Sequence, residues 1–427
     1  MINKSTGDST SIALSGTFDW LYDLDWSPNG NFLLFLTEGQ KRYGIWAIGV
    51  DGRRQQKIIE DSLKLFSPRW SPKGEAIYYL RNKGQTQDLM KISIVPATGK
   101  AKRRPAILLT GLQAGGNFAL SGDGRRLLYT RELNFSNLWL VTVEGSGKAQ
   151  TVKTKPLTTG TAMINDVCVS PNEEQIAFSI GERPTANIFT IPTAGGSMRQ
   201  MTSFNSFNAC PVWSPDGKQI AFGSTQDGAP RVWRVNAEGG TPRPFMRSEL
   251  SEDAFEITWS PGPRLLYRRP GNRNFHILNP DTEEERALVR HDSAGWFFHA
   301  ACSPDGKRVA VNGHQRASPV EKFFFALWII SLEDALQTLL YKGTYFPIRW
   351  SADGKWIYAR KGGTLKIVKI PVEGGEAREV VTLPFKNQPL GDEAYVSMTP
   401  DGKRFVCRAY ETQSDVWMME NFDPEVK

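Results

Sequence analysis

Histidine and cysteine are the scarcest of the residue types in this chain that could perform chemistry, with four of each. Only four histidines occur in 427 residues, namely His276, His291, His299 and His314. Their spacing fits neither HxH nor HExxH, the patterns that place two imidazoles on one metal ion. His291 and His299 flank Asp292 in one segment, which allows a metal or proton-relay site there, and hydrogen-bonded loop histidines are the alternative. The sequence therefore predicts no bound metal and no cofactor.

Motifs for covalent or phosphate chemistry are missing from the sequence as well. It contains no GxSxG pentad for a serine hydrolase, and no GxGxxG loop, HRD or DFG for a kinase. The nearest phosphate-loop match, GSGKA at 145–149, lacks the first glycine and the hydroxyl residue that would hold magnesium. Four widely spaced cysteines without CxxC spacing are expected to be buried free thiols: Cys168, Cys210, Cys302 and Cys407. We therefore predict no catalytic residues and a protein that is not an enzyme.

A repeated tetrad organises the chain and decides which elements position its side chains. It is clearest in Ser214-Pro215-Asp216-Gly217, which follows an anchor residue, Trp213, and nine copies with their anchors occur in total. The copies begin at the following anchor residues: Trp26, Trp70, Leu120, Val169, Trp213, Trp259, Cys302, Trp350 and Met398. Successive anchors are 43 to 50 residues apart, which is the period of a four-stranded propeller blade.

Each copy has the chemistry of a hairpin turn between two strands. Proline presets φ, Asp or Asn bonds to the local backbone, and Gly takes the position that needs positive φ. Recurrent aromatic or aliphatic residues about 20 residues after most anchors mark a third strand, and a second turn signal then leads into a fourth. Since such sheets must stack to bury their faces, the sequence predicts an all-β fold, a single closed β-propeller of eight or nine four-stranded blades.

Residues 11–15 precede the first anchor and have no repeat of their own, while the last repeat ends without room for a fourth strand. We therefore expect an N-terminal strand to close the ring and to remove both exposed edges. The predicted organisation is a disordered tail over residues 1–10, a propeller over 11–422, and a C-terminal tail over 423–427.

The segment Trp213 to Phe222, WSPDGKQIAF, resembles the TolB-like β-propeller repeat, a relative of the WD-type repeat. The resemblance covers about residues 11 to 422 and implies the fold rather than an activity. TolB-like propellers have six blades, whereas nine anchors predict eight or nine. The closing segment Ser414 to Phe422 is similar to the C-termini of sensor propellers attached to bacterial receptor serine/threonine kinases or winged-helix regulators. This resemblance implies a role in a signalling system.

The binding face is expected where the loops entering strand one and joining strands two and three meet, opposite the repeated turn. These loops are rich in aromatic residues, with Arg and Asn beside them, as in a protein or peptide interface. Packing between blades is the alternative for any single residue. The predicted partner-binding residues are Phe207, Asn208, Trp296, His299, Tyr345, Phe346 and Arg349.

We interpret the chain as a non-catalytic module that binds a protein or peptide partner, or a small ligand at the channel mouth. The alternative is a lyase- or lactonase-type propeller enzyme with a metal in its central channel. The net charge of +7 is modest and the basic run at 100–104 contains no aromatics, so no nucleic-acid partner is expected. We expect a monomer without a membrane span, cytoplasmic as written, or periplasmic if the chain belongs to a longer membrane-anchored protein.

Overall fold

Strands are the only regular elements among the residues that the structure describes. The computed structural model describes residues 11–16, 18–39, 42–84, 86–145, 150–249, 256–262, 264–268, 275–282, 284–289, 295–315, 324–385 and 396–426. These strands form eight antiparallel sheets of four or five strands, as expected of a β-propeller protein. Among the described residues there is no helix of the length and apolarity needed to cross a membrane.

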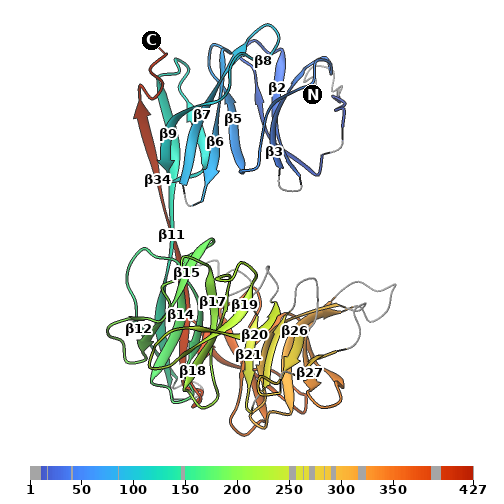
Figure 1. The fold of residues 1–427 in the computed structure, drawn as a ribbon, viewed down its shortest axis with the longest axis vertical. Coiled ribbons are helices and arrows are strands. Elements are labelled where there is room, and N and C mark those ends of the chain that lie inside the picture. Colours follow the sequence, from blue (N-terminus) through green and yellow to red (C-terminus); the bar gives the residue numbers. More distant parts are fainter. Residues whose placement is uncertain are drawn as a thin grey trace. The chain divides into compact units, whose positions relative to one another are not determined.

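The chain divides into two compact units. Unit 1 consists of Met1–Leu133 with Thr412–Lys427, and unit 2 consists of Asn134–Glu411. Two long strands, β11 (Arg126–Glu144) and β34 (Arg404–Glu420), run through both units (Figure 1). The repeat predicts a single propeller over residues 11–422, and the two units share this range between them.

Unit 1 contains three stacked sheets. The first sheet contains β1 (Trp20–Trp26), β2 (Phe32–Gly39), β3 (Arg42–Gly49) and β4 (Gln56–Asp61). The second contains β5 (Leu65–Trp70), β6 (Ala76–Lys83), β7 (Thr86–Val95), β8 (Lys100–Ala101) and β9 (Ala106–Leu112). The third contains β10 (Ala114–Leu120) with the unit 1 portions of β11 and β34. The innermost strand β5 contacts both β1 and β10. The second sheet therefore lies between the other two.

Unit 2 contains five sheets made from consecutive strands, and a sixth that continues the β11 and β34 sheet already counted in unit 1. The strands of the five sheets are β13 (Ile164–Val169), β14 (Gln175–Glu182), β15 (Thr185–Pro192) and β16 (Arg199–Gln200); β17 (Asn208–Trp213), β18 (Gln219–Ser224), β19 (Arg231–Asn236) and β20 (Arg243–Glu249); β21 (Ile257–Ser260), β22 (Arg264–Arg268), β23 (Phe275–Leu278) and β24 (Glu285–Ala287); β25 (Gly295–Cys302), β26 (Arg308–Gln315), β27 (Phe324–Ser331) and β28 (Gln337–Lys342); and β29 (Tyr345–Trp350), β30 (Trp356–Lys361), β31 (Lys366–Pro371) and β32 (Arg378–Thr382).

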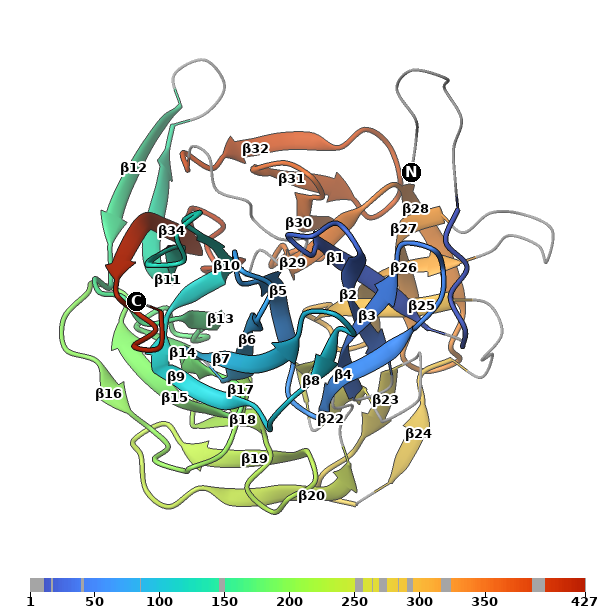
Figure 2. The same cartoon turned by 90° about the horizontal axis from the view of Figure 1, so that it is seen from above.

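The sixth sheet of unit 2 is composite, because it joins the two ends of the unit. It contains β33 (Val396–Met398), the unit 2 portions of β34 and β11, and β12 (Thr151–Pro156). Its β34 buries Phe405 against the β29–β32 sheet and Val406 against the β13–β16 sheet. The innermost strands contact one another in the order β13, β17, β21, β25, β29, β33 and again β13. Figure 2 shows these sheets following one another from green through yellow to orange.

The composite sheet replaces the N-terminal strand that the sequence predicts. Residues 11–16 form no strand, and Ser15 instead exchanges hydrogen bonds with the Gln55 side chain in unit 1. Residues 1–10 lie outside the described residues. At the other end, the predicted C-terminal tail contains a buried residue, Asp423, whose carboxylate accepts hydrogen bonds of 2.6 Å from Tyr78 Oη and Lys91 Nζ.

The repeated tetrad is a hairpin turn between the first two strands of a sheet, as predicted. Between β17 and β18, Ser214 Oγ donates to Asp216 Oδ1 at 2.6 Å, and Asp216 Oδ1 also accepts from the Lys218 amide at 3.0 Å. Gly217 follows with a φ of 71°. The hydroxyl and the carboxylate thus satisfy the turn backbone locally, and glycine supplies the left-handed residue.

Replacing Gly217 by Val should lower the free energy of unfolding by about 1 to 2 kcal/mol, because a β-branched residue is strained at positive φ. The added Cβ would meet only Pro171, at 3.9 Å, so backbone strain rather than a clash causes the loss. Lys218→Ala in the same hairpin should change the stability very little. Urea unfolding of both variants measures the difference, and equal losses would contradict the assigned role of Gly217.

Candidate functional site

The third residue before each anchor occupies a distinctive place on the innermost strand of its sheet. In unit 2, Cys210 and His299 stand at this position with φ of 54° and 47°. Strand register shifts there by one residue, between Ala209 and Val212 in β17 and between Phe298 and Ala300 in β25. Each is a β-bulge, a feature that re-aims the local backbone and side chain.

These bulges link neighbouring sheets through carboxylates at the same repeat position. The Cys210 amide donates to Asp166 Oδ2 at 2.8 Å, and the His299 amide donates to Glu256 Oε1 at 3.4 Å. Asp166 and Glu256 are themselves the third residues before Val169 and Trp259. In each pair, therefore, a carboxylate of one sheet holds the bulge of the next.

Both carboxylates also have partners within their own sheets. Asp166 is buried and accepts from Ser179 Oγ at 3.2 Å. Glu256 Oε2 lies 3.2 Å from Nη1 of the buried Arg268, whose guanidinium stands over the Phe298 ring. These charge-assisted bonds fix both acids as structural supports of the site.

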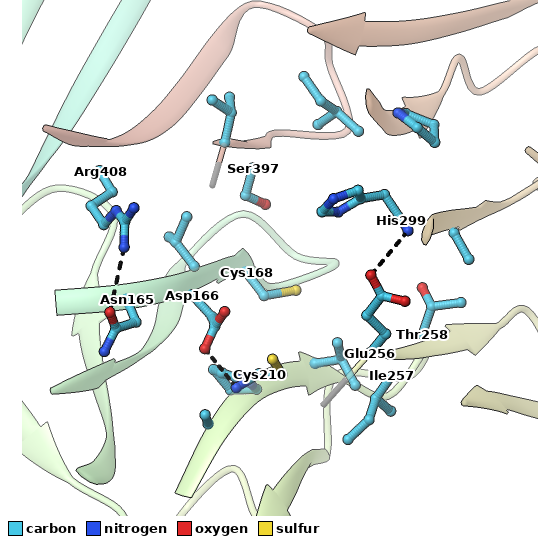
Figure 3. Close-up of a pocket in the computed structure, with 18 of the residues that line it drawn as sticks. Asn165, Asp166, Cys168, Cys210, Glu256, Ile257, Thr258, His299, Ser397 and Arg408 are labelled. Carbon is cyan, nitrogen blue, oxygen red and sulfur yellow. Dashed lines mark hydrogen bonds between the residues drawn. The ribbon is translucent and has the colours of Figure 1, made fainter. Parts of the chain in front are cut away.

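A cavity of about 480 Å³ opens among the innermost strands of unit 2. All six innermost strands contribute to its wall, with Glu182 and Arg183 from the β14–β15 turn and Arg408 from β34. Figure 3 shows Asp166 and Cys210 on one side, and Glu256 with His299 on another. Arg408 Nη1 donates to Asn165 Oδ1 at 3.4 Å.

Cys168, one of the two cysteines in the cavity wall, is not an activated nucleophile by environment. Burial raises the pKa of the Cys168 thiol, and the Trp213 backbone amide and Arg349 only partly oppose that effect. A thiol with a raised pKa stays protonated and reacts slowly. Burial likewise raises the pKa of Cys302, to about 12. All four cysteines are free.

Two of the seven predicted binding residues, Phe207 and His299, line the cavity. The Arg183 guanidinium stands over the Phe207 ring at 4.5 Å from its centroid. Asn208 is fully buried and donates to the Ala186 carbonyl at 2.8 Å. It is therefore a link within the fold and does not reach a partner.

The other four predicted residues lie outside the cavity wall. Tyr345 is 7% exposed and packs between sheets, so its predicted exposure is wrong, whereas Trp296 is 37% exposed. Phe346 meets the His299 ring edge-on at 5.0 Å between centroids and stacks under the buried Arg360. Burial lowers the pKa of Arg349, which is largely enclosed.

Two residues of the predicted metal or proton-relay site, His291 and Asp292, lie outside the described residues. His299 lines the cavity. His276 lies in β23 of a different sheet, where its Nδ1 is 3.0 Å from Oε1 of Glu285 in β24. Among the described residues, no group of three His, Cys, Asp or Glu side chains could hold a metal ion.

Sequence reasoning missed Asp166, Glu256 and Cys210, and the repeat itself holds the signal for them. Counting back three residues from the first eight anchors reaches Asp166, Cys210, Glu256, His299 and Pro347 in unit 2, and Asp23, Ser67 and Asn117 in unit 1. Asp23 Oδ2 accepts from the Ser67 amide at 2.8 Å, so the same link recurs in unit 1. The position links neighbouring sheets in both units, although the residue type changes.

Replacing Asp166 by Ala should lower the free energy of unfolding by about 1 to 3 kcal/mol, because the Cys210 amide would lose its acceptor. Asp166→Asn keeps one acceptor oxygen and should cost less. Asp227→Ala, at an exposed turn position, is the matched control. Chemical denaturation gives the three values, and equal stability of the Asp166→Ala variant and the control would contradict the supporting role of Asp166.

Residues 117–294 match the TolB β-propeller domain family. This range includes parts of both units and the first three sheets after the composite one.

Three relatives show the range of proteins with similar sequences. An uncharacterised protein of Agrobacterium fabrum is 26% identical over 56% of this chain and 82% of its own length. The lasso peptide isopeptidase AtxE2 of Asticcacaulis excentricus is 28% identical over 27% of this chain and 15% of that protein. A TolB homologue of Chlorobium chlorochromatii is 26% identical over 32% and 30%. Among solved structures, an oligogalacturonate lyase in complex with manganese has a TM-score of 0.31 and 16% identity over 84% of this chain and 88% of that chain.

Proposed function

Because the chain carries a TolB-like β-propeller domain, we propose that it is a non-catalytic binding module with its ligand site in the cavity of unit 2. The observation that carries this proposal is the convergence of all six innermost strands on one cavity of about 480 Å³. Ligand sites of this size combine an apolar wall with a few placed polar groups. A rigid sheet scaffold beneath such a cavity suits recognition.

The lining favours a ligand with an apolar body and an anionic or hydrogen-bonding end. The apolar part of the wall includes Phe207, Ile257 and Ile348. Arg183 and Arg408 supply guanidinium groups, and the exposed Arg183 extends the apolar surface of Phe207 by stacking on it. A segment of a partner protein or a peptide has this chemistry, as does a small organic acid.

The hydrogen bonds of the two cavity carboxylates support a binding role over a catalytic one. A general base must have an oxygen directed at the proton that it removes. Asp166 Oδ2 instead accepts from the Cys210 amide and the Ser179 hydroxyl, while Glu256 accepts from the His299 amide and pairs with Arg268. Signal reception in a bacterial regulatory system is the role we propose for such a module, and we place it in the periplasm rather than the cytoplasm.

The test is capture of partners from the native lysate by the wild type and by two charge-reversal variants. Arg183→Glu changes the cavity wall, and Arg103→Glu changes an exposed arginine of unit 1. We expect Arg183→Glu to lose the captured partner and Arg103→Glu to retain it, both with wild-type circular dichroism. Equal capture by the two variants would contradict the cavity as the ligand site.

A separate measurement distinguishes this proposal from the metal-dependent enzyme. The metal content of the purified protein is determined by mass spectrometry, for the wild type and for His299→Ala. A binding module of this kind should show no stoichiometric divalent metal that depends on His299. One equivalent of metal in the wild type, lost in the variant, would favour the lyase- or lactonase-type enzyme.

A further inference from the structure

The anchor tryptophans show how one sheet of this protein docks on the sheet before it. In unit 2, Trp213 Nε1 donates to the Cys168 carbonyl at 3.0 Å, and Trp350 Nε1 donates to the Ala301 carbonyl at 2.8 Å. Both acceptors belong to the residue just before the anchor of the preceding sheet. Trp213 and Trp350 are 7% and 2% exposed. An anchor tryptophan is therefore a docking side chain.

Trp26 is the same residue in the first sheet of unit 1, but it is 47% exposed. No sheet precedes this one in unit 1. Tyr22 packs into the core shared with the second sheet, and Asp25 Oδ2 accepts from the Trp70 amide at 2.8 Å. By alternation along the strand, Trp26 points away from the second sheet, and so does the exposed Leu24. We call this apolar surface, with Leu21, Leu24 and Trp26, the start face.

The outer part of the same side is already covered. Phe18 packs edge-on against Phe35 and Trp46, with ring centroids 6.0 and 5.4 Å apart. The start face is therefore confined to the innermost strand β1, which is where anchor tryptophans dock in unit 2.

Unit 1 has a second apolar surface at its other end. In the third sheet, Leu127 and Tyr129 pack inward with Phe422, which leaves Leu128 on the opposite side. In β34, Met419 packs inward, so Val416 and Met418 alternate to the outer side. Leu128, Val416 and Met418 are all exposed, and we call this surface the end face.

We propose that the start face of unit 1 docks on the end face of a second copy of the chain, and that the reverse contact forms at the same time. Unit 1 has three sheets, and the innermost strands of unit 2 make a circuit of six. Two copies of unit 1 therefore supply six sheets, the number that closes the circuit of innermost strands in unit 2. A two-fold arrangement buries both faces of both copies and leaves no apolar end uncovered.

The repeat also specifies the contact at atomic level. At Trp213 and Trp350, the following sheet donates its anchor indole to the carbonyl just before the preceding anchor. In the dimer, Trp26 Nε1 would donate to the backbone carbonyl of the partner's Ala119, since Ala119 precedes the Leu120 anchor of β10. This inference replaces the monomer that the sequence predicts, and it is independent of the proposed ligand cavity in unit 2.

Sedimentation velocity of the full chain tests the proposal. The wild type should sediment with twice the 47.8 kDa mass of one chain. Trp26→Asp changes the start face and Met418→Asp changes the end face, so each variant alone should sediment as a monomer. Leu336→Asp, at an exposed apolar position of unit 2, should remain a dimer. Circular dichroism melts establish that the variants are folded.

Mixing the two monomeric variants makes the test specific for a start-to-end contact. One of the two interfaces in a mixed dimer would pair an intact start face with an intact end face, so the mixture should recover part of the dimer. A wild type that is monomeric at all concentrations overturns the proposal. A Met418→Asp variant that dimerises like the wild type overturns it as well, because the contact would then not involve the end face.

Discussion

Replacing Phe405 by Ala should lower the free energy of unfolding of unit 2 by about 3 to 5 kcal/mol, as is typical when a fully buried aromatic side chain leaves a cavity. Phe405 is fully buried in β34, where it packs with Ile367 and Val381 of the neighbouring sheet. The residue belongs to the composite sheet, so the variant weakens the place where the two ends of unit 2 meet. Urea unfolding followed by tryptophan fluorescence gives the value.

The matched control lies in the segment that the sequence predicts as the closing strand. Ile12 is partly exposed and belongs to no strand, so Ile12→Ala should cost about 0.5 kcal/mol or less. If Ile12→Ala destabilised the protein as strongly as Phe405→Ala, the N-terminal segment rather than the composite sheet would complete the propeller.

Tyr345→Ala should cost about 3 kcal/mol or more, whereas Trp296→Ala should cost much less. Both aromatics are predicted from the sequence to be part of one exposed binding surface. The structure separates them, because Tyr345 packs with Trp350 and Ile357 between two sheets, and burial raises the pKa of its hydroxyl. Trp296 lies at the end of a strand and keeps more than a third of its surface exposed.

Thermal melts of the two single variants check this prediction without any knowledge of the ligand. A stable Tyr345→Ala variant would mean that Tyr345 is available for a partner, as the loop composition suggests. A strong loss of stability in Trp296→Ala would mean that Trp296 is a packing residue. Either result would contradict the roles of these residues, which are packing for Tyr345 and exposure for Trp296.

Local features of this protein could be predicted from its sequence because they depend on neighbouring residues. The Ser214 to Lys218 turn is an example, since its hydrogen bonds are all made within five residues. The strand class and the inter-sheet role of anchors such as Trp213 follow from the same repeat. These features need no information about distant parts of the chain.

The composite sheet could not be predicted in this way, because its pairing joins segments more than 200 residues apart. The turn motif at Met398 does not show which strand it will meet, yet β33 contacts β13, and Ser397 Oγ accepts from the Val169 amide at 3.0 Å. Nor does the period show that β11 and β34 each run through two compact units.

The cavity was located only in part by sequence reasoning, for a related reason. The loops entering the first strands do surround it, and Phe207 and His299 lie in its wall. Aromatic composition, however, does not distinguish a side chain that faces a cavity from one that packs between sheets, such as Tyr345. The acids that hold the site share a position in the repeat and differ in residue type, so a search for a common residue misses them.

Photo-crosslinking from within the cavity tests the central claim most directly. The photoreactive residue p-benzoylphenylalanine is placed at Phe207, in the cavity wall, and separately at Leu336, which is exposed elsewhere in unit 2. After irradiation in lysate, the cavity as the ligand site predicts a covalent adduct with the captured partner from position 207 and none from position 336. An adduct from position 336 alone, with the partner still captured by the 207 variant, would contradict it.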